Sequence, residues 1–390
     1  MQSDNKKPVT RNLFCSDDAE RLARRRMPRM MFDFVCGGAG SETSQRLNLS
    51  ELEKIRLQPR VLVNVEGRTL GKRFLGEDMG LPFGIAPMGM CNLTWPGADR
   101  MLAAAAVERQ IPVGVSTAAS TTLEEMAECS KGRAWFQLYV GQSNEAALEM
   151  TARAKAAGYS TLMLTVDVPQ ISRRLRDHRN GFQVPFQLGI RQFVDFALHP
   201  RWSVSSLLAG PPSPANFSGG GPRRGFMRNE GRGKVDWTFL AQLRDAWDGN
   251  LIVKGVTFPE DAARIKKTGA DAIYVSNHGG RQLDSAPPAI ATLAPIRAAV
   301  GPDYPLIFDS GIRSGEDVVK ALATGADFVM LGRPMLYAIG ADGLRGLSTL
   351  INNIADEIDT TLAQIGLKDV ADVGRHCLYP PVDKTGSKKE

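Results

Sequence analysis

The stretch LIVKGVTFPEDAARIKKTGADAIYVSNHGG, residues 251–280, contains the pattern that decides the fold. It begins with a short apolar run at 251–255, continues through a helix-like segment at 259–268, and returns to an apolar run at 271–277. Short apolar runs bounded by turn residues are typical of strands buried on both faces, and a connection that carries a helix leaves its two strands parallel. The stretch therefore predicts one β-α-β unit.

The same pattern recurs from residue 82 onward. Eight apolar runs are present: PFGIAP (82–87), IPVGVS (111–116), AWFQLY (134–139), TLMLTVD (161–167), LIVKG (251–255), DAIYVSN (271–277), PLIFDSG (305–311) and DFVMLG (327–332). Helix-like segments lie at 98–109, 122–129, 144–157, 237–247, 259–268, 289–300, 315–324 and 344–365. This alternation predicts an α/β protein with a closed (β/α)8 TIM barrel. A doubly wound open sheet is the alternative, but it usually has a glycine-rich dinucleotide loop after its first strand, and residues 86–89 lack one.

Other parts of the chain lie outside the repeat. Residues 1–81 form an N-terminal extension that we expect to pack on the barrel, with a helix that begins near Ser16. The barrel is expected to span 82–367, and 368–390 to form a C-terminal tail. Residues 168–236 form an insertion after the fourth strand, much longer than a usual connection, and such loops are generally lids or binding segments.

Composition excludes several classes of protein. With 43% hydrophobic and 23% charged residues, the 390-residue chain can bury a full core, which excludes a disordered or fibrous protein. The net charge of +6 is mild; it suits acidic small substrates or an anionic surface, and we expect no nucleic acid partner. The cysteines lack any CxxC spacing, so neither a disulfide framework nor a metal site is expected. They are Cys15, Cys36, Cys91, Cys129 and Cys377.

The N-terminal segment has no apolar region typical of a secretory signal, and the longest charge-free stretches are broken by proline and glycine. We therefore expect a cytoplasmic protein without a transmembrane helix.

Polar and charged residues close most of the predicted strands. In a TIM barrel the chemistry lies at the carboxyl ends of the strands, so these residues are the candidate site. They are Pro87, Met88 and Gly89; Ser116 and Thr117; Gln137 and Tyr139; Thr165 and Asp167; Lys254; Ser276 to Arg281; Asp309 to Arg313; and Gly332 and Arg333.

Lys254 and His278 are the strongest single candidates. Lys254 ends an apolar run, where burying an ammonium group is costly unless an anion or polar ligand compensates. A salt bridge to Asp309 is the structural alternative. His278 lies in a glycine-flanked loop, where the imidazole can titrate near neutral pH. A single histidine is often structural, but Asp167 at the end of the fourth run is a suitable partner for a general base.

Arginines provide candidate sites for anions. Arg174 and Arg281 suit a substrate carboxylate, because two guanidinium groups can bind an acid through bidentate hydrogen bonds; plain surface positions are the alternative. The turns DSGIR (309–313) and GR (332–333) place backbone N–H groups and two arginines where many barrels bind phosphate.

Several segments together resemble the family of FMN-dependent 2-hydroxy acid dehydrogenases and oxidases, which includes enzymes that oxidise lactate, glycolate and mandelate. They are FQLYV (136–140), LTVDVP (164–169), RRLRDHRNGF (173–182), VKG (253–255), SNHGGRQLD (276–284), DSGIRSGEDVVKAL (309–322) and GRP (332–334). They occur in family order between about residues 28 and 367, and SNHGGRQLD is highly specific. Ser310 in place of a usual glycine, with ALHPRWS (197–203), PANF (214–217) and TLAQIG (361–366), is most similar to the membrane-associated mandelate and lactate dehydrogenases.

The resemblance implies roles for the residues that would act on substrate. His278 would be the active-site base, which removes either the hydroxyl proton or the α-proton, and Asp167 would be its partner. Tyr139 would lie near the substrate oxygen. Arg174 and Arg281 would hold the substrate carboxylate.

The resemblance also implies an FMN site. Lys254 would face N1 and the C2 carbonyl of the flavin and stabilise its anionic reduced form. Residues that would line the isoalloxazine are Pro87, Met88, Gly89, Ser116, Gln137, Thr165 and Ser276. Residues that would bind the ribityl chain and phosphate are Asp309, Gly311, Arg313, Gly332 and Arg333.

One substrate-binding position departs from the family pattern. Where a tyrosine usually donates a hydrogen bond to the substrate carboxylate, this chain has Phe34. Losing one hydrogen bond to a charged group costs about 1.5–3 kcal/mol, so small acids should bind weakly. Ala118, where some small-acid oxidases carry a bulky aromatic residue, and Gly89 leave space for an aryl or longer alkyl group. We expect an aromatic or medium-chain (S)-2-hydroxy acid, with lactate as the alternative.

The insertion suggests where electrons leave the protein. Ile190, Phe193, Val194 and Ala197 recur at helical spacing beside Arg191. A basic, glycine-rich run follows, with Arg223, Arg224, Arg228, Arg232 and Lys234. Such a segment can touch an anionic membrane, and packing of the apolar stripe against the barrel is the alternative.

These features lead to expectations about partners. We expect the electrons to pass to a membrane quinone or another carrier, with oxygen as the rival acceptor and a non-catalytic flavin-binding barrel as the rival class. The combination of His278, Arg281, Lys254 and Asp167 argues against that last alternative. We also expect a homo-oligomer, specifically a tetramer, peripheral on the inner face of the membrane if the insertion docks there.

Overall fold

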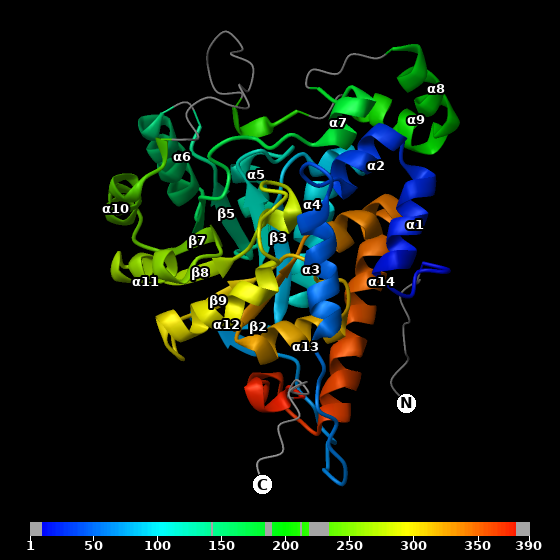
Figure 1. Ribbon diagram of the computed structural model, residues 1–390. Coiled ribbons are helices and arrows are strands. Elements are labelled where there is room, and N and C mark those ends of the chain that lie inside the picture. The colour runs from blue at the N-terminus through cyan, green and yellow to red at the C-terminus, as the bar shows by residue number, and fades with distance from the viewer. Residues whose placement is uncertain (1–9, 142, 184–188, 211–212, 218–233, 380–390) are drawn as a thin grey trace.

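The computed structural model describes residues 10–141, 143–183, 189–210, 213–217 and 234–379. Its centre is a closed barrel of parallel strands in the order β10-β3-β4-β5-β6-β7-β8-β9 (Figure 1). The strands are β3 (Phe83–Met88), β4 (Val113–Ser116), β5 (Ala134–Leu138), β6 (Thr161–Thr165), β7 (Asn250–Val256), β8 (Ala272–Val275), β9 (Leu306–Phe308) and β10 (Phe328–Leu331). Each overlaps one predicted run, so the (β/α)8 barrel is confirmed and the open sheet is excluded.

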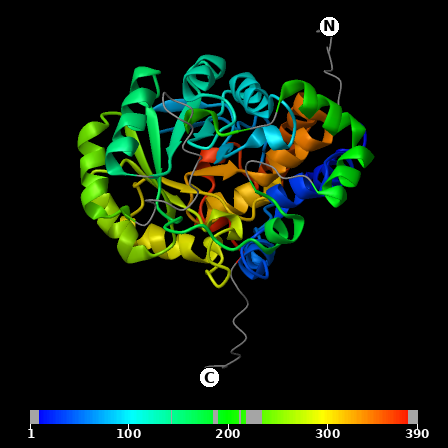
Figure 2. The ribbon, with the colours of Figure 1, turned by 90° about the horizontal axis from the view of Figure 1, so that it is seen from above.

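Helices surround this barrel in a ring, as Figure 2 shows from above. They are α4 (Ala98–Arg109), α5 (Leu123–Ser130), α6 (Asn144–Ala156), α10 (Trp237–Ala246), α11 (Pro259–Lys267), α12 (Ala289–Val300), α13 (Gly315–Thr324) and α14 (Arg333–Ile365). Side-chain caps fix several of their starts; Ser314, for example, forms a capping box with Asp317 at α13. Apart from the start of α14, each predicted end is correct to within one residue.

The predicted start of the last helix is wrong. Helix α14 begins at Arg333, and not at residue 344. Its backbone leaves helical geometry at Asp342 and at Gly343, which has φ +60°, so two helical segments meet at a kink. Glycines are weak helix formers, so Gly340 and Gly343 kept the first segment from being predicted as a helix. That segment begins directly after Gly332, so it brings Arg333 to the carboxyl end of the barrel.

The opposite end of the barrel is closed by side chains. A hairpin of β1 (Lys72–Phe74) and β2 (Glu77–Met79) places Phe74 against Phe328 and Trp135, with ring centroids 5.0 and 6.3 Å apart. Buried side chains from most of the strands, including Ile252 and Met330, fill the interior above it. The carboxyl ends of the strands are left to form a site.

Segments outside the repeat lie over that carboxyl end and along one side of the barrel (Figure 1). From the N-terminus come α1 (Ser16–Arg26), α2 (Arg29–Cys36) and α3 (Thr43–Lys54); α1 packs on α14, and α2 packs beside α7. The insertion between β6 and β7 contains α7 (Leu175–Asn180), α8 (Ile190–Leu198) and α9 (Pro200–Ala209). None of the helices in the described part of the chain is long and apolar enough to cross a membrane.

Candidate functional site

Three polar side chains form a buried chain across neighbouring strands. Ser116 at the end of β4 donates to Oε1 of Gln137 at 2.9 Å, and Nε2 of Gln137 donates to Oγ1 of Thr165 at 2.9 Å. All three residues are buried. Their spacing follows the parallel register that pairs Ser116 with Gln137. The result is a polar floor at one side of the barrel end.

Lys254 continues this floor on β7. Its Nζ lies 3.0 Å from Oδ2 of Asp309 and 2.9 Å from Oγ of Ser276. Tyr274 also donates to Oδ2 of Asp309, at 2.9 Å. Burial acts to raise the pKa of Asp309, but Lys254 and hydrogen bonds from Ser276 and Ser310 outweigh it, so this pKa lies below its ordinary value. The salt bridge considered as a structural alternative is therefore present, within a polar cluster.

His278 lies between two polar partners. Its Nδ1 is 3.1 Å from Oδ1 of Asp167, and its Nε2 is 3.3 Å from the hydroxyl of Tyr139. Burial lowers the pKa of His278, while Asp167 acts in the opposite direction. The imidazole is therefore neutral near pH 7, as a general base requires. The structure thus brings together three predicted residues from the loops and ends of three different strands.

A glycine not singled out from the sequence makes this arrangement possible. Gly255 has φ +101°, and a Cβ placed on it would lie 2.4 Å from Cγ of Asp167. Any other residue would therefore strain the backbone and displace the carboxylate. The signal in the sequence is the glycine that follows Lys254 inside an otherwise apolar strand.

The loop that carries His278 is held by a serine. Ser310 Oγ accepts N–H groups from Asn277 at 3.3 Å and Gly279 at 3.1 Å, and donates to Oδ1 of Asp309 at 2.7 Å. Ser310 adopts φ +84°, and His278 itself adopts φ +58°. Left-handed backbone at two non-glycine residues is costly, so the hydrogen bonds must compensate for it.

Two arginines from the predicted site bind the end of α2. Arg281 donates to the carbonyl oxygens of Gly37 at 2.7 Å and Val35 at 3.3 Å. Arg333 donates to the same two carbonyls, at 3.0 and 3.2 Å, and to that of Gly279 at 2.8 Å. Cations at the C-terminus of a helix are favourable, because the last carbonyl groups carry partial negative charge. Sequence analysis missed this contact, which joins segments about 250–300 residues apart.

The pKa values of these two arginines are both lowered. Burial, and next the charge of Arg174, lower the pKa of Arg281 to about 9. Burial and the charge of Arg281 lower that of Arg333 to about 10, and Arg313 adds to the repulsion. Among the described residues no carboxylate hydrogen-bonds to Arg281 or Arg333. An anion bound beside these arginines would offset the repulsion between them.

The remaining predicted positions lie around these groups. Pro87, Met88 and Gly89 end β3 and are half-buried, and Gly332 lies beside Met88, since a Cβ on it would be 3.6 Å from the Met88 sulfur. Gly311 has φ +103° and lies against α3, where a Cβ would be 2.6 Å from the carbonyl oxygen of Asn48. Packing against α3 thus accounts for this glycine without any ligand.

Phe34 and Arg174 complete the substrate side. The Phe34 ring stacks on Phe182, with centroids 4.5 Å apart, and Cζ of Arg281 lies 5.6 Å from its centroid. Arg174 is half-buried at the start of α7, with its Nη1 3.9 Å from a carboxylate oxygen of Asp177. Both positions therefore adjoin the predicted carboxylate site.

These residues fit flavin mononucleotide by their chemistry. A flat heterocycle with donors and acceptors along its edge suits the row formed by Ser116, Gln137 and Thr165, with Lys254 beside it. The uncompensated charge of Arg281 and Arg333 suits two anions, a phosphate and a carboxylate. The donor set thus agrees with the cofactor and substrate that the sequence motifs imply.

Comparisons of the sequence with known proteins agree with this assignment. The family described as FMN-dependent dehydrogenase matches residues 23–380. (S)-mandelate dehydrogenase of Pseudomonas putida is 39% identical over 367 residues, which are 93% of this chain and 93% of that protein. L-lactate dehydrogenase of Pseudomonas syringae pv. syringae is 36% identical over 375 residues, 94% of this chain and 98% of that protein.

Solved structures give the same answer. The crystal structure of the monotopic membrane protein (S)-mandelate dehydrogenase has a TM-score of 0.91 and 38% identity, and the match covers 95% of this chain and 100% of that one. Mandelate oxidase bound to 3,3-difluoro-2-hydroxy-3-phenylpropionic acid has a TM-score of 0.80 and 35% identity, with 94% and 98% covered. Since both the family match and the relatives span nearly the whole chain, this protein belongs to the FMN-dependent dehydrogenase family.

Proposed function

We propose that this protein oxidises an (S)-2-hydroxy acid to the 2-keto acid with FMN as its cofactor. The observation that carries the proposal is the row of contacts from Asp167 through His278 to Tyr139. Beside it lies Arg281, a cation whose pKa is lowered by burial and by Arg174. A base and a carboxylate-binding cation at one place suit a substrate that carries a hydroxyl next to its carboxylate.

FMN, when bound, supplies the two-electron oxidant. The residues that would hold its ring are Pro87, Met88, Gly89, Ser116, Gln137, Thr165, Lys254 and Ser276. The residues that would hold its ribityl chain and phosphate are Asp309, Gly311, Arg313, Gly332 and Arg333. The polar row of Ser116, Gln137 and Thr165 supports the placement of the ring. The repulsion between Arg281 and Arg333 supports the placement of the phosphate.

His278 is the base in the proposed mechanism. A carboxylate only accepts hydrogen bonds, so Asp167 fixes the proton of the neutral ring on Nδ1 and leaves the lone pair of Nε2 for a substrate proton. When Nε2 takes that proton, the Asp167 carboxylate stabilises the imidazolium. Tyr139 lies at the same nitrogen and would position the substrate oxygen. The proton taken is either that of the hydroxyl or that of the α-carbon.

Arg174 and Arg281 would bind the substrate carboxylate. Their charges repel each other, so an anion between them would lower the cost of burying both. Phe34 adjoins Arg281 and offers an apolar ring without a hydroxyl donor. The carboxylate would thus be held by charge, with one hydrogen bond fewer than the family pattern provides.

The expected substrate has a large apolar group. Gly89 and Ala118 lie against each other, since a Cβ on Gly89 would be 3.0 Å from that of Ala118. Two small residues at this end of β3 and β4, with the ring pair of Phe34 and Phe182, support an aromatic or medium-chain 2-hydroxy acid. Burial of each CH₂ contributes roughly 0.8 kcal/mol, which can offset a missing hydrogen bond.

Electrons are proposed to leave through a membrane carrier such as quinone. The stripe of Ile190, Phe193 and Val194 on α8 is exposed, and Leu207 and Leu208 on α9 are more than 80% exposed. The alternative that this stripe packs on the barrel is therefore wrong. An exposed apolar face of this kind favours membrane contact. The basic run at Arg223, Arg224, Arg228 and Arg232 lies outside the described residues.

An anaerobic titration tests the oxidation. The purified yellow protein is mixed with mandelate, lactate, glycolate or a medium-chain 2-hydroxy acid, and loss of flavin absorbance is followed. Bleaching by at least one (S)-acid is expected, and absence of bleaching by all of them would contradict the proposal. Since one structural relative is an oxidase, a dye-coupled assay and oxygen consumption are then compared; faster turnover with the dye or a quinone is expected.

Two further predictions concern organisation. We propose a homotetramer, to be measured by light scattering of the purified protein. We also propose the division into 1–81, 82–367 with the insertion 168–236, and 368–390. The start of β3 at Phe83 and the three helices between β6 and β7 support these boundaries.

A further inference from the structure

The insertion after β6 returns to the barrel beside the proposed substrate space. Its residues 213–217 include the short 3₁₀ helix η2 (Ala215–Phe217). Asn216 in this helix is buried, with 3% of its surface exposed. Burying an amide without hydrogen-bond partners is costly, so the partners of Asn216 show what holds this segment in place.

The amide of Asn216 joins the two ends of one loop. Its Nδ2 donates to the carbonyl oxygen of Thr117 at 3.3 Å, and its Oδ1 accepts the backbone N–H of Leu123 at 2.8 Å. Thr117 directly follows β4, and Leu123 is the first residue of α5. The first N–H groups of a helix have no partner within it, so the Asn216 oxygen satisfies one of them. A single side chain thus closes the loop formed by residues 117–123.

Further contacts hold η2 at the same junction. The N–H of Ala215 donates to the carbonyl oxygen of Ala119 at 2.9 Å. Nη1 of Arg153 on α6 donates to the carbonyl oxygen of Asn216 at 3.2 Å, and Arg153 also pairs with Glu124 of α5 at 2.9 Å. The return of the insertion is therefore bound to α5, to α6 and to the loop after β4.

The loop that Asn216 closes carries Ala118, whose small side chain is proposed to leave room for the substrate. A Cβ on Gly89 would lie 3.0 Å from that of Ala118, so the ends of β3 and β4 meet at these two residues. Ala118 accepts the N–H of Met90 at 2.8 Å through its carbonyl oxygen and donates its own N–H to Oγ of Ser116 at 3.2 Å. A shift of the loop would therefore move Ala118 relative to both Gly89 and the polar row that begins at Ser116.

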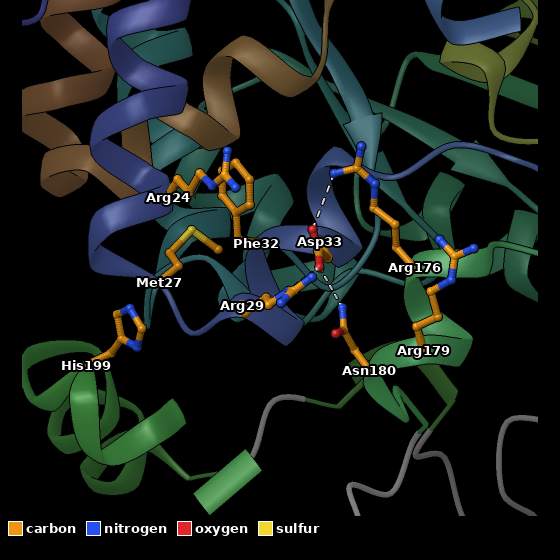
Figure 3. Close-up of a pocket in the computed structure, with 9 residues that line it drawn as sticks. All are labelled: Arg24, Met27, Arg29, Phe32, Asp33, Arg176, Arg179, Asn180 and His199. Carbon is orange, nitrogen blue, oxygen red and sulfur yellow. Dashed lines mark hydrogen bonds and ion pairs between the residues drawn. The ribbon is translucent and has the colours of Figure 1, made fainter. Parts of the chain in front are cut away.

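Another anchor of the insertion holds a different part of it. Figure 3 shows Arg176 and Asn180 of α7 converging on Asp33 of α2, with Nη1 of Arg176 3.3 Å and Nδ2 of Asn180 2.7 Å from the carboxylate. The cavity of about 380 Å³ beside this contact is not lined by the loop after β4. The start of the insertion is thus fixed to an N-terminal helix, whereas its return at Asn216 is fixed beside the proposed substrate space.

We infer that Asn216 is a positioning residue for substrate selectivity, which holds the loop of Ala118 where it leaves space for a large apolar group. The inference rests on the proposed preference for aromatic or medium-chain 2-hydroxy acids and assigns part of that preference to the insertion. Without the amide, the carbonyl oxygen of Thr117 and the N–H of Leu123 lose a partner, and neither end of the loop is fixed by the insertion. Glycolate has no side group that could reach Ala118, so its oxidation should respond less than that of a large substrate.

The ratio of kcat/KM for a large substrate to kcat/KM for glycolate tests the inference on the holoenzyme. The large substrate is mandelate or 2-hydroxyoctanoate, whichever the wild type oxidises faster. Both values are measured on one preparation of each variant, so an unfolded or inactive fraction cancels in the ratio. N216A is expected to lower the ratio by at least ~5-fold, because the fit of a single methylene group in an apolar pocket changes kcat/KM by roughly 10-fold or more.

The matched control is N353A. Asn353 also uses its amide to bind the backbone of a distant segment, since its Nδ2 donates to the carbonyl oxygens of Leu13 at 3.1 Å and Phe14 at 3.0 Å. It is not among the predicted site residues. N353A should therefore keep the wild-type ratio, and an equal fall of the ratio in N353A and N216A would overturn the inference.

Substitution A118L locates the effect of Asn216. A leucine fills the space at this position, so A118L alone should lower the ratio. If Asn216 acts through the loop of Ala118, the ratio of N216A/A118L should be close to that of A118L, since the effects of coupled positions do not add. Losses that multiply in the double variant would place the effect of Asn216 elsewhere and overturn the inference.

Hydrogen exchange checks the contact itself. The amide of Leu123 should exchange faster in N216A than in the wild type or N353A, because it loses its acceptor. Unchanged exchange at Leu123, or faster exchange with an unchanged substrate ratio, would overturn the inference. A wild type that prefers glycolate would instead contradict the proposed substrate class, a result that is detected without any variant.

Discussion

Nδ1 of His278 lies 3.1 Å from Oδ1 of Asp167, and Gly255 provides the space in which that carboxylate lies. The contact has two effects on the imidazole. It selects the tautomer whose Nε2 can accept a proton, and it opposes the lowering of the His278 pKa by burial. Asp167 should therefore control both the rate of proton removal and its dependence on pH.

Substitution D167N should lower kcat and shift the pH profile. Without the carboxylate the imidazolium loses a charge-assisted hydrogen bond, worth about 1.5–3 kcal/mol, so kcat should fall by at least ~10-fold. Burial then acts unopposed, and the pKa of His278 should fall further. Activity is present above this pKa and is lost as the pH falls through it. The acidic limb of kcat/KM should therefore move to lower pH.

Steady-state rates across the acidic range check this prediction. The variant D245N, which changes an exposed carboxylate on α10, serves as the control and should keep the wild-type profile. An acidic limb that stays in place or moves to higher pH in D167N would show that Asp167 does not act on His278 as described.

Substitution H278A should abolish fast substrate oxidation while FMN remains bound. General base catalysis is generally worth 10²–10⁴-fold, so we expect a loss of at least ~100-fold in the anaerobic rate of flavin bleaching. The matched control is H178A, a histidine exposed on α7. Stopped-flow absorbance measures the rate, and the visible spectrum measures bound FMN. A near-normal rate in a yellow H278A protein would remove His278 from the mechanism.

The wild-type enzyme should prefer large substrates. Phe34 offers no hydrogen bond to the substrate carboxylate, while Gly89 and Ala118 are both small. Apolar burial of an aryl or medium alkyl group should therefore decide the ranking. We expect kcat/KM for mandelate or a medium-chain 2-hydroxy acid to exceed that for glycolate, measured with the same dye. A clear preference for glycolate would contradict this account of the pocket.

Substitution F34Y should narrow that preference. The ring lies beside Arg281, so a phenolic hydroxyl there would restore the donor that the family pattern has. A hydrogen bond to a charged group is worth about 1.5–3 kcal/mol, so kcat/KM for glycolate and lactate should rise by roughly 10-fold or more. The control F14Y changes an exposed ring that is not among the predicted site residues. An unchanged KM for both small acids in F34Y would place the carboxylate elsewhere.

The strands of the barrel were predictable because each is buried on both faces. Residues such as Leu251 to Val253 and Leu306 to Phe308 form unbroken apolar runs that no solvent-exposed element would have. The candidate site followed from the same pattern, since parallel strands bring their carboxyl ends together. The positions of the strand ends were enough to predict that Asp167, Lys254 and His278 lie close together.

Other features depend on contacts that local sequence does not encode. Arg281 and Arg333 bind the carbonyl groups of Val35 and Gly37, which requires knowledge of where α2 docks. The apolar periodicity of α8 was visible in the sequence. Such a pattern identifies the apolar face of a helix, but it does not show what that face contacts. Phe193 is 67% exposed, and only the structure shows that this face points to solvent.

Ser310 provides the last prediction, because its backbone and side chain act in opposite directions on stability. At φ +84° a residue with a Cβ is strained by about 1–2 kcal/mol relative to glycine. Its hydroxyl repays this by accepting the N–H groups of Asn277 and Gly279 and by donating to Asp309. S310A should keep the strain and lose the bonds, whereas S310G loses the bonds and relieves the strain. S310A is therefore expected to be less stable than S310G by about 1 kcal/mol in chemical unfolding. In both variants the amides of Asn277 and Gly279 should exchange hydrogen faster and kcat should fall, since the loop that carries His278 is no longer fixed. Equal stability of the two variants would show that Ser310 carries no strain. Unchanged exchange at both amides would show that its hydroxyl does not position the loop.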